Sequence, residues 1–149
     1  MQKNKIGLLI IGMLLLALML VACGGDTASE GGEGGGDCSS DNVLCVGLVT
    51  DVGEVDDKSF NQSAWEGAQQ AASDLGAQVD FIETKDAKDY GANIALFADD
   101  GYDVIVTVGF AMGEATAEAA AKYPDINFIG VDQFQGEPVD NLAGLIFNE

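Results

Sequence analysis

The chain has 149 residues, of which 6 are basic, 25 are acidic and none is histidine. A surface this negative repels phosphate backbones, which excludes nucleic acid as a partner, and it disfavours adsorption to anionic lipid. The absence of histidine removes Ser-His-Asp and Cys-His arrangements and the commonest metal ligand. Composition therefore favours a protein that is not an enzyme and that carries no metal or cofactor.

Residues 1–22 have the pattern of a secretory signal peptide. Two lysines precede an uncharged run over residues 6–22 that is rich in Leu, Ile and Met. This run is at the lower limit for a membrane-spanning helix, so a retained anchor is the alternative. The sequence Leu-Val-Ala-Cys at 20–23 resembles a bacterial lipobox, in which the cysteine is lipidated and becomes the new N-terminus. We therefore expect a chain attached to the plasma membrane through lipid on Cys23, on the extracytoplasmic face.

A flexible tether is expected to follow the lipidated cysteine, over residues 23–42. Residues 24–42 contain seven glycines, five acids and almost no apolar side chain. Such a segment cannot bury enough surface to offset its ordering entropy. Loss of the signal peptide leaves 4 lysines against 25 acids, a net charge of −21.

Two further cysteines, Cys38 and Cys45, lie seven positions apart on either side of a turn-like Ser-Ser-Asp-Asn sequence. An oxidising compartment outside the cytoplasm permits a disulfide between them. The alternative is that Cys45 is only a buried strand residue, because its neighbours are apolar.

From Val43 onward the pattern alternates between strands and helices. Residues 43–49 form a continuous apolar run, which is typical of a strand covered on both faces. A helix over 59–75 follows, with a capping box of Ser59 and Gln62 at its start and Gly76 at its end. The elements expected after it are strand 78–82, helix 86–100, strand 103–108, helix 114–122, strand 126–131 and strand 142–147.

Strands that alternate with helices of this length predict right-handed βαβ units on a parallel, Rossmann-like sheet, and therefore an α/β fold. The chain ends directly after its last strand, at Glu149. Either the sequence is truncated or this strand lies at an edge of the sheet, and we expect truncation.

In an open parallel sheet, ligands bind at the carboxyl ends of the strands, near the point where strand order reverses. The segments at such positions are 50–61, 109–113 and 132–135. The first has one glycine and four acids, so it would repel the phosphate that a dinucleotide-binding turn attracts. It suits a neutral or cationic ligand with hydroxyl or amine donors. Its Asp56 and Asp57 could do acid–base work, or they could simply complement a helix dipole.

Four segments closely resemble the basic membrane lipoprotein family, whose members are substrate-binding proteins of ABC importers related to purine nucleoside receptors. These segments are Val-Gly-Leu-Val-Thr-Asp-Val-Gly at 46–53, Asp-Asp-Lys-Ser-Phe-Asn-Gln-Ser-Ala-Trp-Glu-Gly at 56–67, Val-Gly-Phe-Ala-Met at 108–112 and Ile-Gly-Val-Asp-Gln at 129–133. The resemblance implies the bilobal type 1 periplasmic-binding-protein fold, of which residues 43–149 would be the incomplete N-terminal lobe. Glu54 departs from the family pattern, which often has a second glycine there.

The resemblance also implies a ligand site. Phe60 would stack on a nucleoside base, or else pack under its helix with Ala64. Asn61 would pair with a purine edge, or be a surface amide. The candidate ligand-binding residues are Asp51, Ser59, Phe60, Asn61, Gly109, Phe110 and Asp132.

The other candidates have plainer alternatives. Asp51 and Asp132 would accept hydrogen bonds from the ligand, or they are ordinary turn residues at strand ends. Gly109 and Phe110 would line the cleft, or they only connect a strand to a helix. Trp65 is expected in the core.

These features predict an extracytoplasmic solute-binding lipoprotein of an ABC importer, which captures a purine nucleoside or a similar small molecule. Its partners would be that solute, the ABC permease subunits and the membrane that holds its lipid. The alternatives are an α/β enzyme acting on nucleosides and a surface lipoprotein with an adhesive or signalling role.

Overall fold

The computed structural model describes residues 38–40 and 42–147. The expected signal peptide, Cys23 and most of the tether lie outside the described residues. Within the described part, no helix is long and apolar enough to cross a membrane.

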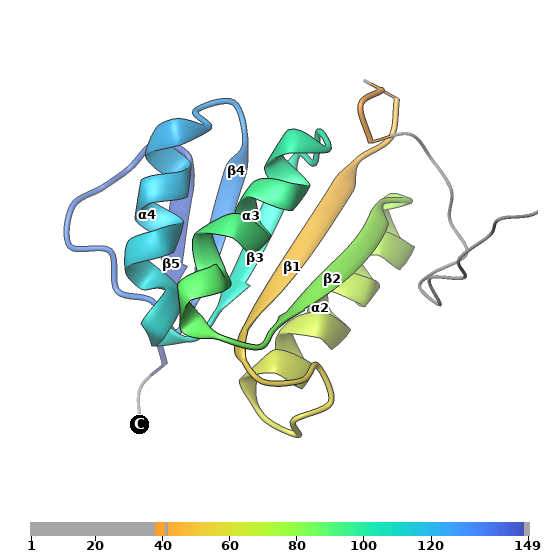
Figure 1. The fold of residues 1–149 in the computed structure, drawn as a ribbon. Helices are drawn as coiled ribbons and strands as arrows, with labels where there is room; N and C mark the ends of the chain where they lie inside the picture. Colours follow the sequence, from red (N-terminus) through yellow and green to blue (C-terminus); the bar gives the residue numbers. More distant parts are fainter. Residues whose placement is uncertain (1–37, 41, 148–149) are drawn as a thin grey trace, which may run out of the picture. The chain divides into compact units, whose positions relative to one another are not determined.

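Five parallel strands form one sheet in the order β2-β1-β3-β4-β5 (Figure 1). The strand order reverses between β1 and β3, because β1 pairs with β2 on one side and with β3 on the other. The α/β fold with a parallel, Rossmann-like sheet is therefore confirmed. The strands are β1 (Cys45–Val52), β2 (Gln78–Thr84), β3 (Val104–Val108), β4 (Asn127–Val131) and β5 (Leu142–Leu145).

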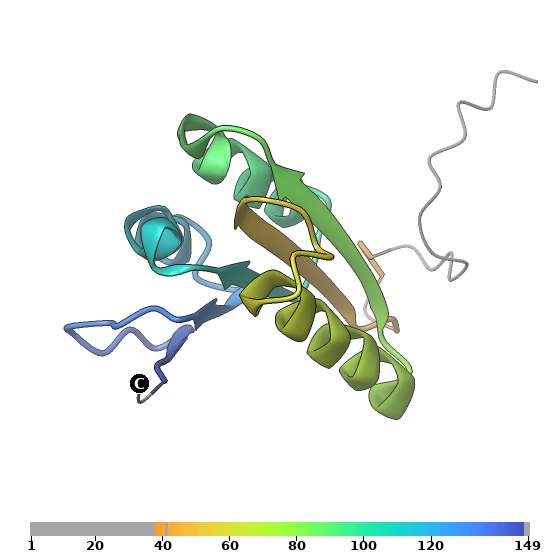
Figure 2. The same cartoon turned by 90° about the horizontal axis from the view of Figure 1, so that it is seen from below.

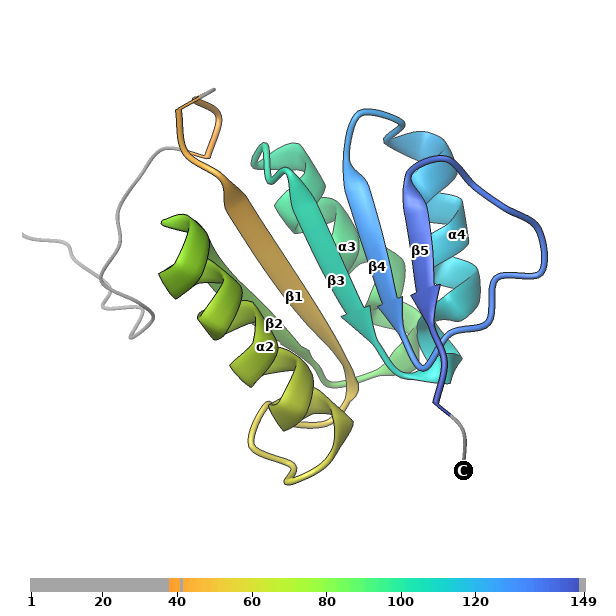
Figure 3. The ribbon, with the colours of Figure 1, turned by 180° about the vertical axis from the view of Figure 1, so that it is seen from behind.

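Helices cover both faces of the sheet. Helix α2 lies on one face, and α3 and α4 lie on the other (Figures 2 and 3). Right-handed crossovers require this division, because the chain moves one way from β1 to β2 and the other way from β2 to β4. The helices are α2 (Phe60–Leu75), α3 (Tyr90–Asp99) and α4 (Gly113–Lys122), with short 3-10 turns η2 (Ala87–Asp89) and η3 (Phe110–Met112).

The apolar run of β1 is explained by this two-sided cover. Cys45 and Val49 point into the core under α3 and α4, whereas Val46 and Leu48 point into the core under α2. Gly47 leaves space for α3, since a Cβ there would lie 2.5 Å from the Phe97 ring.

One side of α3 packs into the core. Its four buried residues recur at helical spacing and are Tyr90, Ile94, Phe97 and Ala98. On the other face of the sheet, Trp65 packs edge-on against Phe81 with ring centroids 4.9 Å apart.

The capping box predicted for Ser59 and Gln62 at the start of α2 is wrong. Ser59 occupies the N-cap position, but its side chain makes no capping hydrogen bond. Asp57 caps instead, because its Oδ1 accepts from the backbone N–H of Ser59 (2.7 Å) and of Gln62 (3.1 Å). A carboxylate bonds more strongly than a hydroxyl and complements the helix dipole. At the other end, Gly76 closes α2 at φ 69°, as expected.

The last strand lies at an edge of the sheet. β5 pairs only with β4 among the described strands, and the connection over residues 132–141 contains no helix. The strand ends at Leu145, two residues earlier than predicted, and Ile146 and Phe147 continue past the sheet, both more than half exposed.

A disulfide joins Cys38 to Cys45 at the amino-terminal end of β1. Cys45 is fully buried there, and its backbone N–H donates to the Asp103 carboxylate at 2.7 Å. The backbone of Cys38 and Ser39 passes close to Gly101, which has φ 81°. The disulfide therefore fixes the described end of the tether at the edge where the strands begin.

Substituting Cys38→Ser should lower the free energy of unfolding by about 2 kcal/mol, because a short covalent loop no longer restricts the unfolded chain. Chemical denaturation of the mature chain measures this. A reductant should produce the same shift in the unsubstituted protein and none in the variant. Equal stability of the two proteins under oxidising conditions would contradict a stabilising role.

Candidate functional site

The three segments expected to contact a ligand lie at one edge of the sheet. They follow β1, β3 and β4, whose carboxyl ends point downward in Figure 1 and toward the viewer in Figure 2. Ile146 and Phe147 reach the same edge after β5. The site is therefore built by chain segments up to about a hundred residues apart in sequence.

Asp51 lies at the centre of this edge, where β1 and β3 diverge. Its Oδ1 accepts a hydrogen bond from Asn61 Nδ2 at 3.1 Å. Gly109, directly after β3, adopts φ 97°, and a Cβ at this position would lie 2.7 Å from Asp51 Oδ2. Gly109 is thus required twice, for its backbone conformation and for the space that the Asp51 carboxylate fills.

Asn61 is not the surface amide considered as an alternative. Its side chain is 2% exposed, because the first turn of α2 places it beneath the loop that follows β1. One amide hydrogen goes to Asp51, and Oδ1 has no partner within the described residues. Asn61 therefore orients Asp51 and keeps one buried acceptor free.

The loop after β1 is tied to β2. Thr50 Oγ1 donates to the Gly53 carbonyl at 3.0 Å and accepts from Thr84 N–H at 3.1 Å. Val55 N–H donates to Glu83 Oε1 at 3.0 Å. This hydrogen bond from the Val55 backbone is the main reason why the pKa of Glu83 is lowered from its ordinary value. The loop is held to β2 on one side, and its Glu54 and Asp56 side chains are exposed.

Asp132 has the left-handed conformation, with φ 58°. This conformation costs a non-glycine residue roughly 1–2 kcal/mol, least for Asp and Asn. The strain is maintained by its neighbours, because Val131 accepts from Gly109 N–H at 2.9 Å and Gln133 N–H donates to Leu145 at 3.2 Å. Backbone strain of this kind accumulates at functional positions.

Four phenylalanines at this edge keep much of their surface in solvent. Phe110 is 81% exposed, Phe134 79%, Phe147 53% and Phe60 38%. Phe60 and Phe147 contact each other, with ring centroids 5.4 Å apart. Exposed aromatic surface gathered in one place indicates a binding region.

Sequence reasoning assigned no role to Phe134 and Phe147. Phe134 lies within segment 132–135, which the sequence already placed at this edge. Its aromatic side chain was the signal that could have identified it as a candidate. Phe147 was interpreted as part of a strand, and nothing local distinguishes it from the apolar residues before it.

Ser59, also a candidate, is exposed, and its backbone N–H is bonded to Asp57. Asp57 receives hydrogen bonds from the start of α2, which favours the helix-dipole interpretation over acid–base work. Among the described residues, no group of three or more potential ligands is arranged to hold a metal ion.

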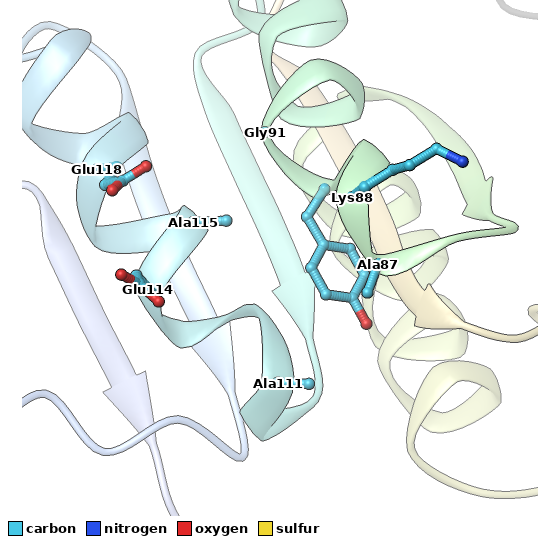
Figure 4. Close-up of a pocket in the computed structure, with 8 residues that line it drawn as sticks. Ala87, Lys88, Gly91, Ala111, Glu114, Ala115 and Glu118 are labelled. Carbon is cyan, nitrogen blue, oxygen red and sulfur yellow. The ribbon is translucent and has the colours of Figure 1, made fainter.

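A groove of about 430 Å³ lies between α3 and α4 (Figure 4). Lys88 and Tyr90 line one side, and Glu114 and Glu118 of α4 line the other. Lys88 is already paired with Asp86, at 2.8 Å. None of the candidate ligand residues lines this groove, although Ala111 of segment 109–113 does.

The fold is that of one lobe of an ABC solute-binding protein. A solute-binding protein from Aeropyrum pernix K1 superposes with a TM-score of 0.64 at 33% identity, over 69% of this chain and 28% of that one. A putative lipoprotein fragment from Peptoclostridium difficile 630 shares the fold at a TM-score of 0.63 and 22% identity, over 69% and 84% of the two chains.

Residues 45–149 match the Bmp family, described as ABC transporter substrate-binding protein PnrA-like, and the chain belongs to this family. The resemblance seen in the sequence is thereby confirmed.

Relatives in this family differ in what their names state. A CD4+ T-cell-stimulating antigen of Listeria innocua is 31% identical over the whole of this chain and 42% of its own length. The ABC transporter nucleoside-binding protein BmpA of Lactococcus lactis is 31% identical over 89% of this chain and 37% of its own. An uncharacterized lipoprotein of Pyrococcus horikoshii is 32% identical over 99% and 35%. The chain thus spans 35–42% of the length of these relatives.

The attachment of the acidic loop should depend on pH. Because the folded pKa of Glu83 is lowered, the contribution of its hydrogen bond is complete above the ordinary value of 4.5 and is lost as pH falls through the lower folded value. The Val55 amide proton shift, followed by NMR, should therefore titrate with a midpoint below 4.5. In Glu83→Gln, whose side-chain oxygen still accepts, that transition should disappear. A midpoint at or above 4.5 would contradict this account.

Substituting Gly109→Ala should destabilise the protein by about 2 kcal/mol or more, because alanine is strained at this φ and its Cβ displaces Asp51. Gly67→Ala is the matched control. Gly67 is an exposed position of α2 with open space around a Cβ, so alanine there should be neutral or stabilising. Denaturation midpoints of the two variants test this, and equal midpoints would contradict the close packing of Asp51 on Gly109.

Proposed function

We propose that the protein to which this lobe belongs captures a purine nucleoside or a similar solute outside the cytoplasm and delivers it to an ABC permease. The observation that carries this proposal is the combination at the strand ends of a fixed carboxylate, Asp51, with exposed phenylalanine rings. Such a surface offers hydrogen-bond acceptors beside flat apolar faces.

The chemistry of the edge supports a ligand with a ring system and hydrogen-bond donors. Asp51 and Asp132 accept hydrogen bonds from hydroxyl or amino groups, and the ring of Phe60 or Phe110 stacks on a flat base. Glu54 and Asp56, both exposed in the same loop, repel a phosphate. The proposed ligand is therefore a nucleoside rather than a nucleotide.

Membership of the Bmp family supports a solute-binding role and a permease partner, since the family is described as ABC transporter substrate-binding and one relative is named a nucleoside-binding protein. Affinity would come from stacking and a few convergent hydrogen bonds in a closed cleft, and release from opening of the lobes. This lobe alone is expected to bind weakly, because half of the ligand surface stays in water.

The attachment to the membrane also suits this role. Relatives named as lipoproteins support lipidation of Cys23, followed by a tether with a reach on the order of 20–25 Å. The disulfide of Cys38 and Cys45 fixes the tether to the edge where strands begin. The ligand edge lies at the other end of the strands.

The decisive experiment is calorimetry on the full-length protein without residues 1–23, titrated with nucleosides, sugars and amino acids. We expect tight binding of a purine nucleoside. Phe60→Ala should weaken it by about tenfold or more, because stacking of one base on an aromatic ring contributes roughly 1–3 kcal/mol. Asp51→Asn should also weaken it, by removing a charged acceptor.

Matched controls come from the far end of α2. Leu75→Ala removes an apolar side chain that is 68% exposed, and Asp74→Asn removes an exposed carboxylate. Both should leave affinity unchanged. Turnover of the nucleoside would favour an enzyme, and absence of binding to every solute class would overturn the receptor proposal.

A further inference from the structure

We propose that Gln133 is a positioning residue, which sets ligand affinity by holding Gly109 and Asp132 in their unusual backbone conformations without touching the ligand. This inference rests on the proposed function for its binding assay, and it has a second readout that does not.

Gln133 is buried in the turn after β4, with 2% of its surface exposed. Its Nε2 donates to the Gly109 carbonyl at 3.1 Å and to Thr107 Oγ1 at 3.1 Å, with the Thr107 carbonyl further away at 3.4 Å. Two carbonyls require a donor, which fixes which end of the amide faces β3. The side chain thus joins the end of β4 to the end of β3.

The hydrogen bonds continue in one direction away from Gln133. Thr116 Oγ1 donates to the Met112 carbonyl at 2.9 Å, so the hydroxyl of Thr107 donates to Thr116 at 2.8 Å and accepts from Gln133. All of these groups are buried. Gln133 is therefore the end of an ordered polar network that runs from α4 to the ligand edge.

The sheet is shaped to admit this side chain. Gly130 and Gly144 are register partners on β4 and β5. A Cβ on Gly130 would collide with Gln133 Oε1, and a Cβ on Gly144 would collide with the Gln133 carbonyl oxygen. Two facing glycines where strands otherwise favour larger residues indicate that the position of Gln133 is specifically accommodated.

Both unusual conformations depend on these contacts. Gly109, at φ 97°, donates its N–H to Val131 and accepts from the Gln133 side chain. Asp132, at φ 58°, lies between Val131 and Gln133, and both neighbours are bonded to other strands. Removing the Gln133 amide frees the carbonyl of Gly109. Gly109 also donates its N–H to Val131, the residue before Asp132, so a shift of Gly109 reaches Asp132 through Val131.

The test compares Gln133→Met with Thr116→Val in the full-length protein without residues 1–23. Both variants break the same buried network and should lower the melting temperature, but only the first loses the bond to Gly109. With guanosine as the probe, Gln133→Met should raise Kd about tenfold more than Thr116→Val, the factor that corresponds to one hydrogen bond. Equal Kd values would overturn the inference, because they would reduce Gln133 to a purely structural role.

A double substitution locates the effect. With Asp132→Ala already present, Gln133→Met should raise Kd much less, since the residue that it positions is gone. Fully additive effects would overturn the inference. If Gln133→Met does not fold, Gln133→Asn retains both donors on a shorter side chain and should give an intermediate Kd.

The ligand-free readout is the HN–Hα coupling constant of Asp132, which depends on φ. It should change in Gln133→Met and stay constant in Thr116→Val, and no change in the first variant would overturn the inference. Failure of the unsubstituted protein to bind guanosine would instead count against the proposed nucleoside ligand, and the coupling constant would still decide the role of Gln133.

Discussion

The reversal of strand order between β1 and β3 is the constraint on which the site depends. Right-handed crossovers send the chain after β1 to one face of the sheet and the chain after β3 to the other, so both leave the same edge in opposite directions. Where they diverge, the Asp51 carboxylate occupies the space that a Cβ at residue 109 would fill. A carboxylate can therefore lie where the strand order reverses only if residue 109 is a glycine. Asn61 then fixes the orientation of that carboxylate through a hydrogen bond.

Four acids in and beside the loop after β1 divide into two groups by what they bond. Asp57 accepts from backbone N–H groups at the start of α2, and Glu83 accepts from Val55, so both hold the loop in shape. Glu54 and Asp56 are exposed and add negative potential to the edge. Some carboxylates thus hold the loop in shape, and others leave their charge in solvent. This division explains how an edge so rich in acids keeps a defined conformation and still presents free negative charge to solvent.

Local pattern was enough to predict the fold and the three segments that meet at the carboxyl ends of the strands, because burial alternates with the same period as the strands and helices that produce it. The buried face of α3 follows from spacing alone. Sequence could not show that Asp57 rather than Ser59 caps α2, since both residue types cap and the path of the loop decides. Nor could it show that Asn61 is buried, that Phe147 reaches Phe60, or that Gln133 bonds to Thr107, because these contacts join residues distant in sequence.

The exposed phenylalanines indicate that this edge of the sheet binds something. A ring that is four-fifths exposed, such as Phe110 or Phe134, gains little from folding, and its apolar surface is available to whatever covers the edge. In the proposed site, hydrogen bonds from a ligand to Asp51 and Asp132 would be weak while water competes for the same carboxylates, and they would strengthen when water is excluded. Affinity in such a site therefore depends on closure more than on any single contact. The proposed receptor would need that dependence to release its solute, because opening of the cleft would readmit water to the carboxylates and the rings together.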